Sequence, residues 1–114
     1  MTKKTTREIG NDGESVACNF LMDKGWEILE RNYNFKKSEI DIIASHKGVY
    51  IFIEVKLRSS TNFGSPIEYV TEEKVEHVYN AADAWMLEHN LHDKPMRFDV
   101  IGIIKKKNSP PIIN

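Results

Sequence analysis

Residues 39–56 read EIDIIASHKGVYIFIEVK, in which two apolar runs flank the dipeptide Lys47-Gly48. A glycine-containing pair between two such runs is a strong signal for a two-residue β-hairpin loop. If Lys47 and Gly48 form that loop, His46 pairs with Val49 and Ile43 lies opposite Phe52. The second strand is apolar on both faces in its first half, which suits the centre of a sheet that helices cover on both sides.

The same register brings charged side chains together, with Asp41 opposite Glu54 and Glu39 opposite Lys56. Opposed Cβ atoms lie about 5 Å apart, so two facing carboxylates destabilise the sheet unless something offsets their repulsion. A divalent cation such as Mg²⁺ or Mn²⁺ would do so, and Lys56 beside it could orient a water or stabilise charge on a phosphate. The alternative is a solvated hairpin, since a slip of one residue turns Asp41 and Glu54 to opposite faces.

The chain has 114 residues, a formal net charge of −1 and one cysteine, Cys18. We expect a flexible N-terminal segment over residues 1–11, one domain over 12–107 and a C-terminal tail over 108–114. A lone cysteine fits a reducing compartment, and no apolar stretch has the length of a signal peptide or a membrane span. These features predict a cytoplasmic protein that does not associate with membranes.

A net charge near zero argues against a protein that coats nucleic acid by bulk electrostatics. Local groups of basic residues could still neutralise a few phosphates, although short lysine runs often only keep a surface soluble. These groups are Lys3-Lys4 with Arg7, Lys36-Lys37, Lys56 with Arg58, and Lys105-Lys106-Lys107.

The remaining pattern predicts a compact α/β domain. Helical spacing of apolar residues is found over residues 12–24 and again from an N-cap at Thr71. Strands are expected over residues 26–33, 39–45, 49–57 and 97–104, and an irregular loop over 59–70 could close over a substrate. The order is α-β-β-β-α-β, which predicts a mixed central sheet flanked by helices.

Glu14 is the charged position of interest in the first helix. At 100° per residue it lies on the edge of the apolar arc, at the boundary of the core. The alternative is a glutamate favoured at the helix start by the macrodipole.

Several blocks of the chain together resemble the small bacterial YraN-like family. The blocks are Gly13-Glu14, Arg31-Asn32, residues 39–43, residues 52–58, the helix carrying Lys74, and Arg97-Phe98-Asp99-Val100. The resemblance runs from about Gly13 to Ile104. It implies a restriction-endonuclease-like fold with a PD-(D/E)xK site and a layout similar to archaeal Holliday junction resolvases.

The resemblance also implies roles for single residues. Asp41 matches the motif aspartate, and Glu54 and Lys56 match the E-x-K pair. Glu14 matches a glutamate of the first helix, and the Val55 carbonyl matches a further metal ligand. The implied catalytic residues are therefore Asp41, Glu54, Lys56 and Glu14, and the implied metal ligands are Asp41, Glu54, Val55 and Glu14. Ser38 departs from the family, in which glycine usually precedes Glu-Ile-Asp.

Other charged residues have weaker assignments. Arg31, Arg58 and Lys74 are candidate phosphate contacts, or else ordinary exposed basic side chains. Glu39 is a candidate partner that holds Lys56, or else half of a simple cross-strand salt bridge. Asp99 is equally compatible with a structural ion pair.

Two functions from different classes are consistent with these features. One is a Mg²⁺-dependent endonuclease that hydrolyses phosphodiester bonds in DNA, with a homodimer expected if the DNA is branched. The other is a non-catalytic nucleic-acid-binding module that retains the nuclease fold.

Overall fold

The computed structural model describes residues 12–58, 71–104 and 112–113. Its elements are α2 (Asp12–Asp23), β1 (Glu27–Phe35), β2 (Ser38–His46), β3 (Val49–Arg58), α3 (Glu72–Glu88), β4 (Met96–Ile104) and β5 (Ile112–Ile113). This order confirms the predicted α/β domain with order α-β-β-β-α-β. The short strand β5 lies within the predicted C-terminal tail and was not expected.

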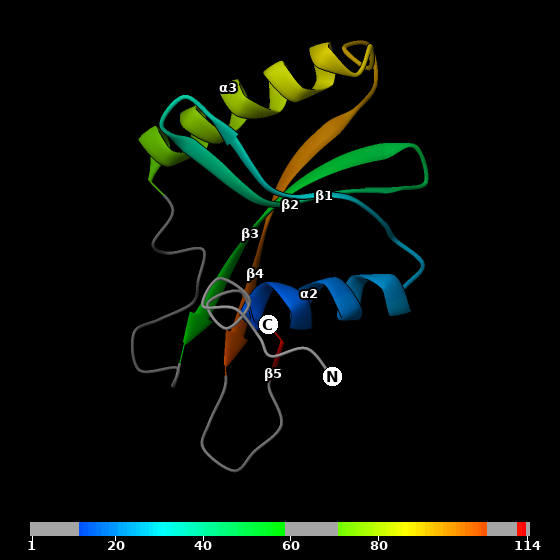
Figure 1. Ribbon diagram of the computed structural model, residues 1–114, viewed down its shortest axis with the longest axis vertical. Helices are drawn as coiled ribbons and strands as arrows, with labels where there is room; N and C mark the ends of the chain where they lie inside the picture. The colour runs from blue at the N-terminus through cyan, green and yellow to red at the C-terminus, as the bar shows by residue number, and fades with distance from the viewer. Residues whose placement is uncertain (1–11, 59–70, 105–111, 114) are drawn as a thin grey trace, which may run out of the picture.

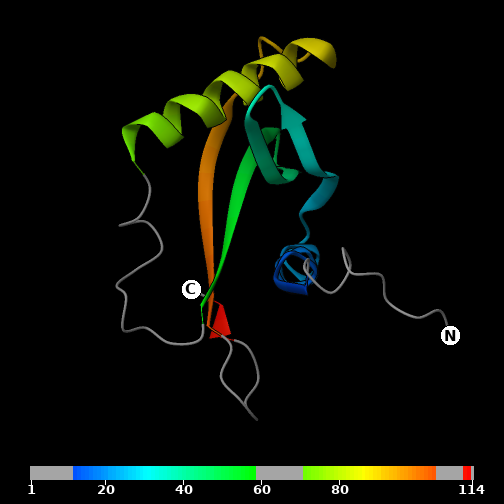
Figure 2. The same ribbon diagram turned by 60° about the vertical axis from the view of Figure 1, so that its left-hand side comes forward.

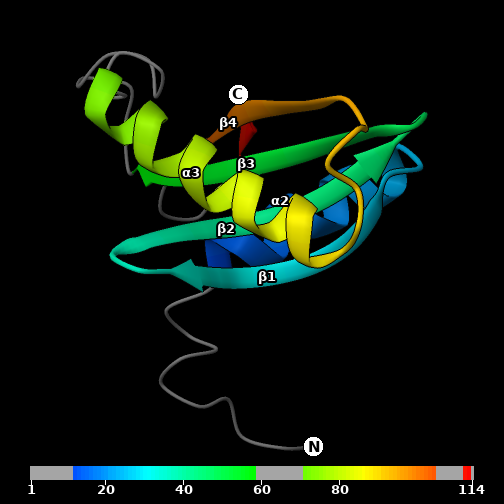
Figure 3. The ribbon, with the colours of Figure 1, turned by 90° about the horizontal axis from the view of Figure 1, so that it is seen from above.

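One mixed sheet forms the centre of the domain (Figure 1). Its strand order is β1-β2-β3-β4-β5, with β3 and β4 parallel and all other neighbours antiparallel. Figure 2 shows α3 and α2 on opposite sides of the sheet, and Figure 3 shows the same arrangement from above. The predicted sheet flanked by helices is therefore confirmed.

The hairpin between β2 and β3 has the predicted turn. Lys47 and Gly48 both have positive φ, at 50° and 80°, as a two-residue turn of the type common in hairpins requires. His46 pairs with Val49 and Ile43 with Phe52, as expected.

The pairing of β2 with β3 ends earlier than the sequence predicts. Ile42 opposite Ile53 is the last pair, so the expected pairs of Asp41 with Glu54 and of Glu39 with Lys56 do not form. From this point toward its N-terminal end, β2 pairs only with β1, and β2 diverges from β3 (Figure 1).

Asn32 lies in β1 between Arg31 and Tyr33, which pair with Ile42 and Ile40 at the point where β2 leaves β3. It has a left-handed backbone, with φ of 55°, and residues on its two sides then face opposite layers instead of sharing a face. Tyr33 packs under α3, whereas the Arg31 guanidinium contacts Ser15 of α2. The reversal recurs in the neighbouring strand, where Ile40 packs on the α3 side and Ile42 on the α2 side.

Two apolar clusters fill the layers on the two sides of the sheet. The α3 side contains Tyr33, Ile40, Ile43, Phe52, Val78, Ala81, Ala82, Trp85 and Met86. The α2 side contains Ala17, Cys18, Leu21, Ile42, Ala44, Ile51, Ile53 and Ile103. β3 contributes to both clusters, as its apolar first half predicts.

The helix termini follow local signals. The Thr71 hydroxyl caps α3 by accepting a hydrogen bond from the Lys74 N–H at 3.1 Å, as expected for an N-cap threonine. Gly25 has a φ of 86° just after α2, and the Trp26 N–H returns to the Leu21 carbonyl at 3.0 Å. This arrangement ends the helix where glycine is favoured.

Several sequence expectations lie outside the described residues. They are the segment 1–11, the loop 59–70, the lysine run 105–107 and residues 108–111 and 114 of the tail. Within the described residues, no helix has the length and apolar character needed to cross a membrane.

Candidate functional site

Asp41 lies where β2 separates from β3. Its Oδ2 accepts a hydrogen bond from the Val55 N–H at 2.8 Å. Burial raises the pKa of Asp41 to about 6; the Val55 N–H opposes this shift, while the negative charges of Glu14, Glu54 and Glu39 add to it. The environment of Asp41 is therefore unfavourable for the charge of its own carboxylate.

Two further acids lie next to Asp41. Carboxylate oxygens of Glu14, Glu39 and Asp41 lie within 4.8 Å of one another. Glu14 comes from the first turn of α2, whereas Glu39 and Asp41 lie two residues apart on β2. We call these three residues the carboxylate cluster.

Glu14 is held by a basic residue of the neighbouring strand. Its side chain is only 12% exposed, and its Oε2 lies 3.6 Å from Nη2 of Arg31. That distance is too long for a hydrogen bond. The buried Oε2 atom has no hydrogen-bond partner among the described residues.

Glu54 lies outside the carboxylate cluster and contacts two lysines. Its Oε1 is 3.2 Å from Nζ of Lys74 in α3 and 3.4 Å from Nζ of Lys56 in β3. The side chain is 13% exposed, and its Oε2 is also buried without a hydrogen-bond partner in the described part of the chain. One oxygen of Glu54 is thus neutralised and the other is left available.

The donor set fits a hard divalent cation. Buried polar atoms are nearly always hydrogen bonded, so the two unpartnered oxygens of Glu14 and Glu54 call for a ligand. Carboxylate oxygens are the ligands that Mg²⁺ and Mn²⁺ prefer. Glu14, Glu39, Asp41 and Glu54 are four carboxylates, and the described ion pairs bring three basic side chains to only two of them, which leaves negative charge for a cation to neutralise.

The backbone of Val55 faces the gap between β2 and β3. In a strand the N–H and C=O of one residue point to the same side, and the Val55 N–H points to Asp41. The Val55 carbonyl is therefore directed toward the same gap, where the resemblance implies a metal ligand.

Two of the three candidate phosphate contacts, Arg31 and Lys74, pair with acids of the site. Arg31 and Lys74 pair with Glu14 and Glu54, each with more than a third of its side chain exposed. Arg58 is the last residue of β3, and its side chain is not among those described. Lys56 pairs with Glu54 instead of Glu39.

Sequence reasoning missed the position of Glu39 among the acids. We expected it to hold Lys56, whereas the structure places it beside Glu14 and Asp41. The signal was available, because Glu39 and Asp41 are two residues apart on one predicted strand and share a face.

Comparison with known proteins identifies relatives along most of the chain. Residues 13–103 match the family described as "Uncharacterised protein family UPF0102". A UPF0102 protein of Clostridioides difficile (strain 630) is 45% identical over 97 residues, which cover 85% of each chain. A UPF0102 protein of Chlorobium phaeobacteroides (strain BS1) is also 45% identical over 97 residues, covering 85% of this chain and 77% of the relative.

A third relative, from Flavobacterium psychrophilum, is 39% identical over 100 residues, which cover 88% of this chain and 83% of the relative. The family region, residues 13–103, includes every residue of the candidate site from Glu14 to Lys74. The chain therefore belongs to the UPF0102 or YraN-like family, which is part of the restriction-endonuclease-like superfamily.

Proposed function

We propose that this protein is a metal-dependent endonuclease that hydrolyses phosphodiester bonds in DNA. The observation that carries the proposal is the pair of buried, unpartnered carboxylate oxygens on Glu14 and Glu54, two acids whose charges both act on Asp41. Membership of the restriction-endonuclease-like superfamily supports the choice of substrate class.

Mg²⁺ or Mn²⁺ would be held by Asp41, Glu14, Glu54 and the Val55 carbonyl, with Glu39 as a further donor from the carboxylate cluster. When bound, such an ion supplies a Lewis acid that polarises a phosphodiester and lowers the pKa of water. Asp41 contributes a fixed position, because the Val55 N–H holds its Oδ2.

Lys56 is the residue best placed to act on the attacking water or on the phosphate. Its ammonium lies 3.4 Å from Glu54, with a third of its side chain exposed. It can therefore donate a hydrogen bond to a water or to a phosphate oxygen without leaving the site. Arg31 and Lys74 add exposed positive charge on either side, where they could bind flanking phosphates.

A second candidate function is a nucleic-acid-binding module without turnover. The observation that favours it is the pairing of Glu54 with two lysines, which places Glu54 outside the carboxylate cluster. In this reading the same basic residues bind phosphates and the acids are structural.

The test is incubation of the protein with Mg²⁺ or Mn²⁺ and a panel of single-stranded, duplex, flap and four-way DNA. Glu54→Gln and Lys56→Met remove the two residues of the E-x-K pair. The matched controls are Glu76→Gln and Lys94→Met, because both side chains belong to exposed residues away from the site. We expect cleavage by the native chain and both controls, and loss of at least about 100-fold in the two site variants.

The outcomes separate the two functions. Cleavage that persists in Glu54→Gln and Lys56→Met would point to a contaminating nuclease and contradict the proposal. Binding of DNA without cleavage, with the same affinity in the presence of EDTA, would favour the non-catalytic module.

A further inference from the structure

Among the described strands, β4 has an open edge along most of its length. The sheet order places β3 on one side of β4 and β5 on the other, but β5 pairs only with Ile103 and Ile104. No described strand pairs with residues 96–102 on that side. The burial follows this division, since residues 102–104 are buried whereas residues 96–101 remain half-buried or exposed.

The backbone groups that face this edge can be identified. The Pro95 carbonyl accepts a hydrogen bond from the Tyr50 N–H of β3 at 3.0 Å. Backbone groups alternate in direction along a strand, so those of Arg97 and Asp99 also face β3. Those of Met96, Phe98 and Val100 therefore face outward, where they offer donors and acceptors to another strand.

Three devices that often protect an edge against such pairing are missing from residues 96–102. Proteins block exposed edges with proline, lysine or a bulge. Residues 96–102 contain neither proline nor lysine, and their register with β3 is continuous over the whole segment.

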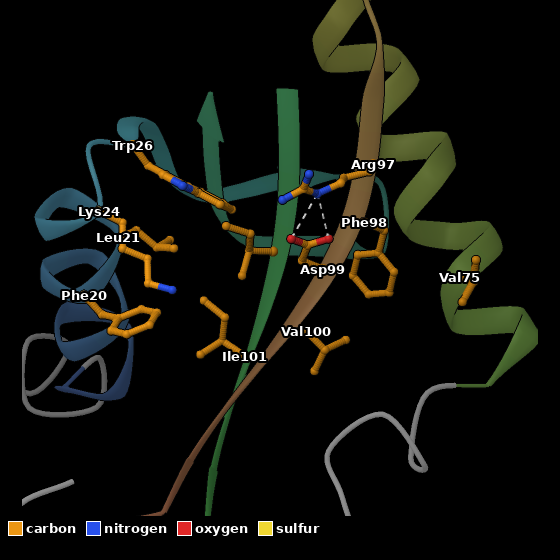
Figure 4. A pocket seen from close by; sticks show the side chains of 11 residues that line it. Phe20, Leu21, Lys24, Trp26, Val75, Arg97, Phe98, Asp99, Val100 and Ile101 are labelled. Carbon is orange, nitrogen blue, oxygen red and sulfur yellow. Dashed lines mark hydrogen bonds and ion pairs between the residues drawn. The ribbon is translucent and has the colours of Figure 1, made fainter. Parts of the chain in front are cut away.

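A hollow of about 580 Å³ lies beside the edge (Figure 4). Phe20 of α2 and Trp26, which follows that helix, line one side of it, and Phe98, Val100 and Ile101 belong to β4 itself. Within the same hollow Arg97 donates to both carboxylate oxygens of Asp99, at 3.1 and 3.2 Å. The edge is thus apolar with one positive and one negative group.

We propose that a second copy of this chain occupies the edge, with the two β4 strands antiparallel and a two-fold axis at Phe98. In this register Arg97 lies opposite Asp99 of the second copy, and Asp99 lies opposite Arg97 of the second copy. Phe98 meets its own equivalent, and Met96 meets Val100. The interface is isologous, as a two-fold axis requires.

Hydrogen bonding and charge both favour this register. With Phe98 on the axis, the outward backbone groups of Met96, Phe98 and Val100 form hydrogen-bonded pairs, which gives about six bonds across the interface. An axis at Arg97 or at Asp99 would place two like charges opposite each other, which is destabilising. The sequence Arg97-Phe98-Asp99 is therefore complementary to itself in the antiparallel direction.

β5 limits the length of the interface without blocking it. It occupies the edge only at Ile103 and Ile104, beyond the five residues from Met96 to Val100 that the dimer uses. The two-fold axis is normal to the combined sheet, so the α2 helices of the two copies lie on the same side of that sheet. The interface needs neither a metal nor nuclease activity.

The experiment is sedimentation equilibrium of the full chain and of two charge variants, Arg97→Asp and Asp99→Arg. We expect a dimer for the native chain. Each variant alone places like charges opposite each other twice, so its dissociation constant should rise by at least about tenfold. An equimolar mixture of the two variants restores both attractive pairs and should form a heterodimer.

The mixture separates an interface from a structural role of the ion pair within one chain. Both variants lose the internal Arg97–Asp99 pair equally, and mixing cannot restore it. A native chain that stays monomeric at concentrations on the order of 100 µM would overturn the proposal. A mixture that stays monomeric while the native chain dimerises would overturn it as well, and so would dimerisation of each variant alone with native affinity.

Discussion

The carboxylate of Asp41 occupies the place of a backbone acceptor for the Val55 N–H, which it binds at 2.8 Å. Continuation of the β2–β3 pairs beyond Ile42 and Ile53 would have brought Ile40 opposite Val55. The side chain therefore satisfies a donor that the divergence of the strands would leave unpaired. The Asp41 carboxylate thus fills the gap between β2 and β3 that the end of their pairing creates.

Asp41→Asn should stabilise the protein at neutral pH in the absence of metal. The asparagine oxygen can still accept the Val55 N–H, while the charge opposed by burial and by three nearby acids is removed. The expected gain is about 1–3 kcal/mol in the free energy of unfolding, measured by urea denaturation at pH 7.5. Equal or lower stability of the variant would contradict the assigned environment of Asp41.

The stability difference between the native chain and Asp41→Asn should depend on pH. The pKa of Asp41 is about 6 in the folded state against a model value of 3.8, so the folded state retains a proton that the unfolded state releases. The native chain therefore loses stability relative to the variant as pH rises from about 4 to about 6, and the loss is complete above that range. Unfolding midpoints of both proteins between pH 4 and pH 8 measure it, and a constant difference would refute it.

Glu39→Gln should weaken Mn²⁺ binding although the residue is exposed. Its carboxylate lies in the carboxylate cluster with Glu14 and Asp41, so its removal lowers the negative charge that attracts the ion. We expect a decrease in affinity of about tenfold by calorimetry. Glu76→Gln is the control and should bind Mn²⁺ as the native chain does.

Lys74→Met should destabilise the metal-free protein by about 1 kcal/mol, because Glu54 loses the closer of its two lysine partners. The same variant should show a larger thermal stabilisation by Mn²⁺ than the native chain, since a competing cation has been removed from Glu54. Differential scanning calorimetry with and without Mn²⁺ measures both effects. A smaller stabilisation by Mn²⁺ would mean that Glu54 is not a ligand.

Asn32→Ala should cost about 1 kcal/mol of stability, because alanine adopts a left-handed backbone less readily than asparagine. Asn32→Gly is the control, since glycine adopts this conformation without a steric penalty and should retain native stability. Chemical denaturation of both variants tests the strain, and equal stabilities would show that the left-handed conformation is not costly.

The central hairpin could be predicted from the sequence because its signals are local. Lys47-Gly48 and the apolar runs around it determine both the turn and the first pairs, such as Ile43 with Phe52. Glu14 was likewise placed by helical angle, and it lies at the edge of the buried layer as predicted.

Beyond Ile42 and Ile53, the side of the sheet that each side chain of the hairpin faces could not be predicted in this way. Period-two counting from Phe52 places Asp41 and Glu54 opposite each other, but at the left-handed Asn32 the side chains of β1 and of its partner β2 change faces. Asparagine adopts that conformation only in some contexts, so no local rule required the reversal. The short strand β5 was missed because two residues carry no periodic signal.

The reversal at Asn32 also bears on how firmly Asp41 is positioned. Its neighbour Ile40 is anchored beneath α3, and its other neighbour Ile42 is anchored beneath α2, each at most 2% exposed. The Cα of Asp41 cannot shift without disturbing apolar contacts in both layers, which are closely packed. The acid is thereby preorganised, so that binding of a ligand requires little reordering of the backbone that presents it.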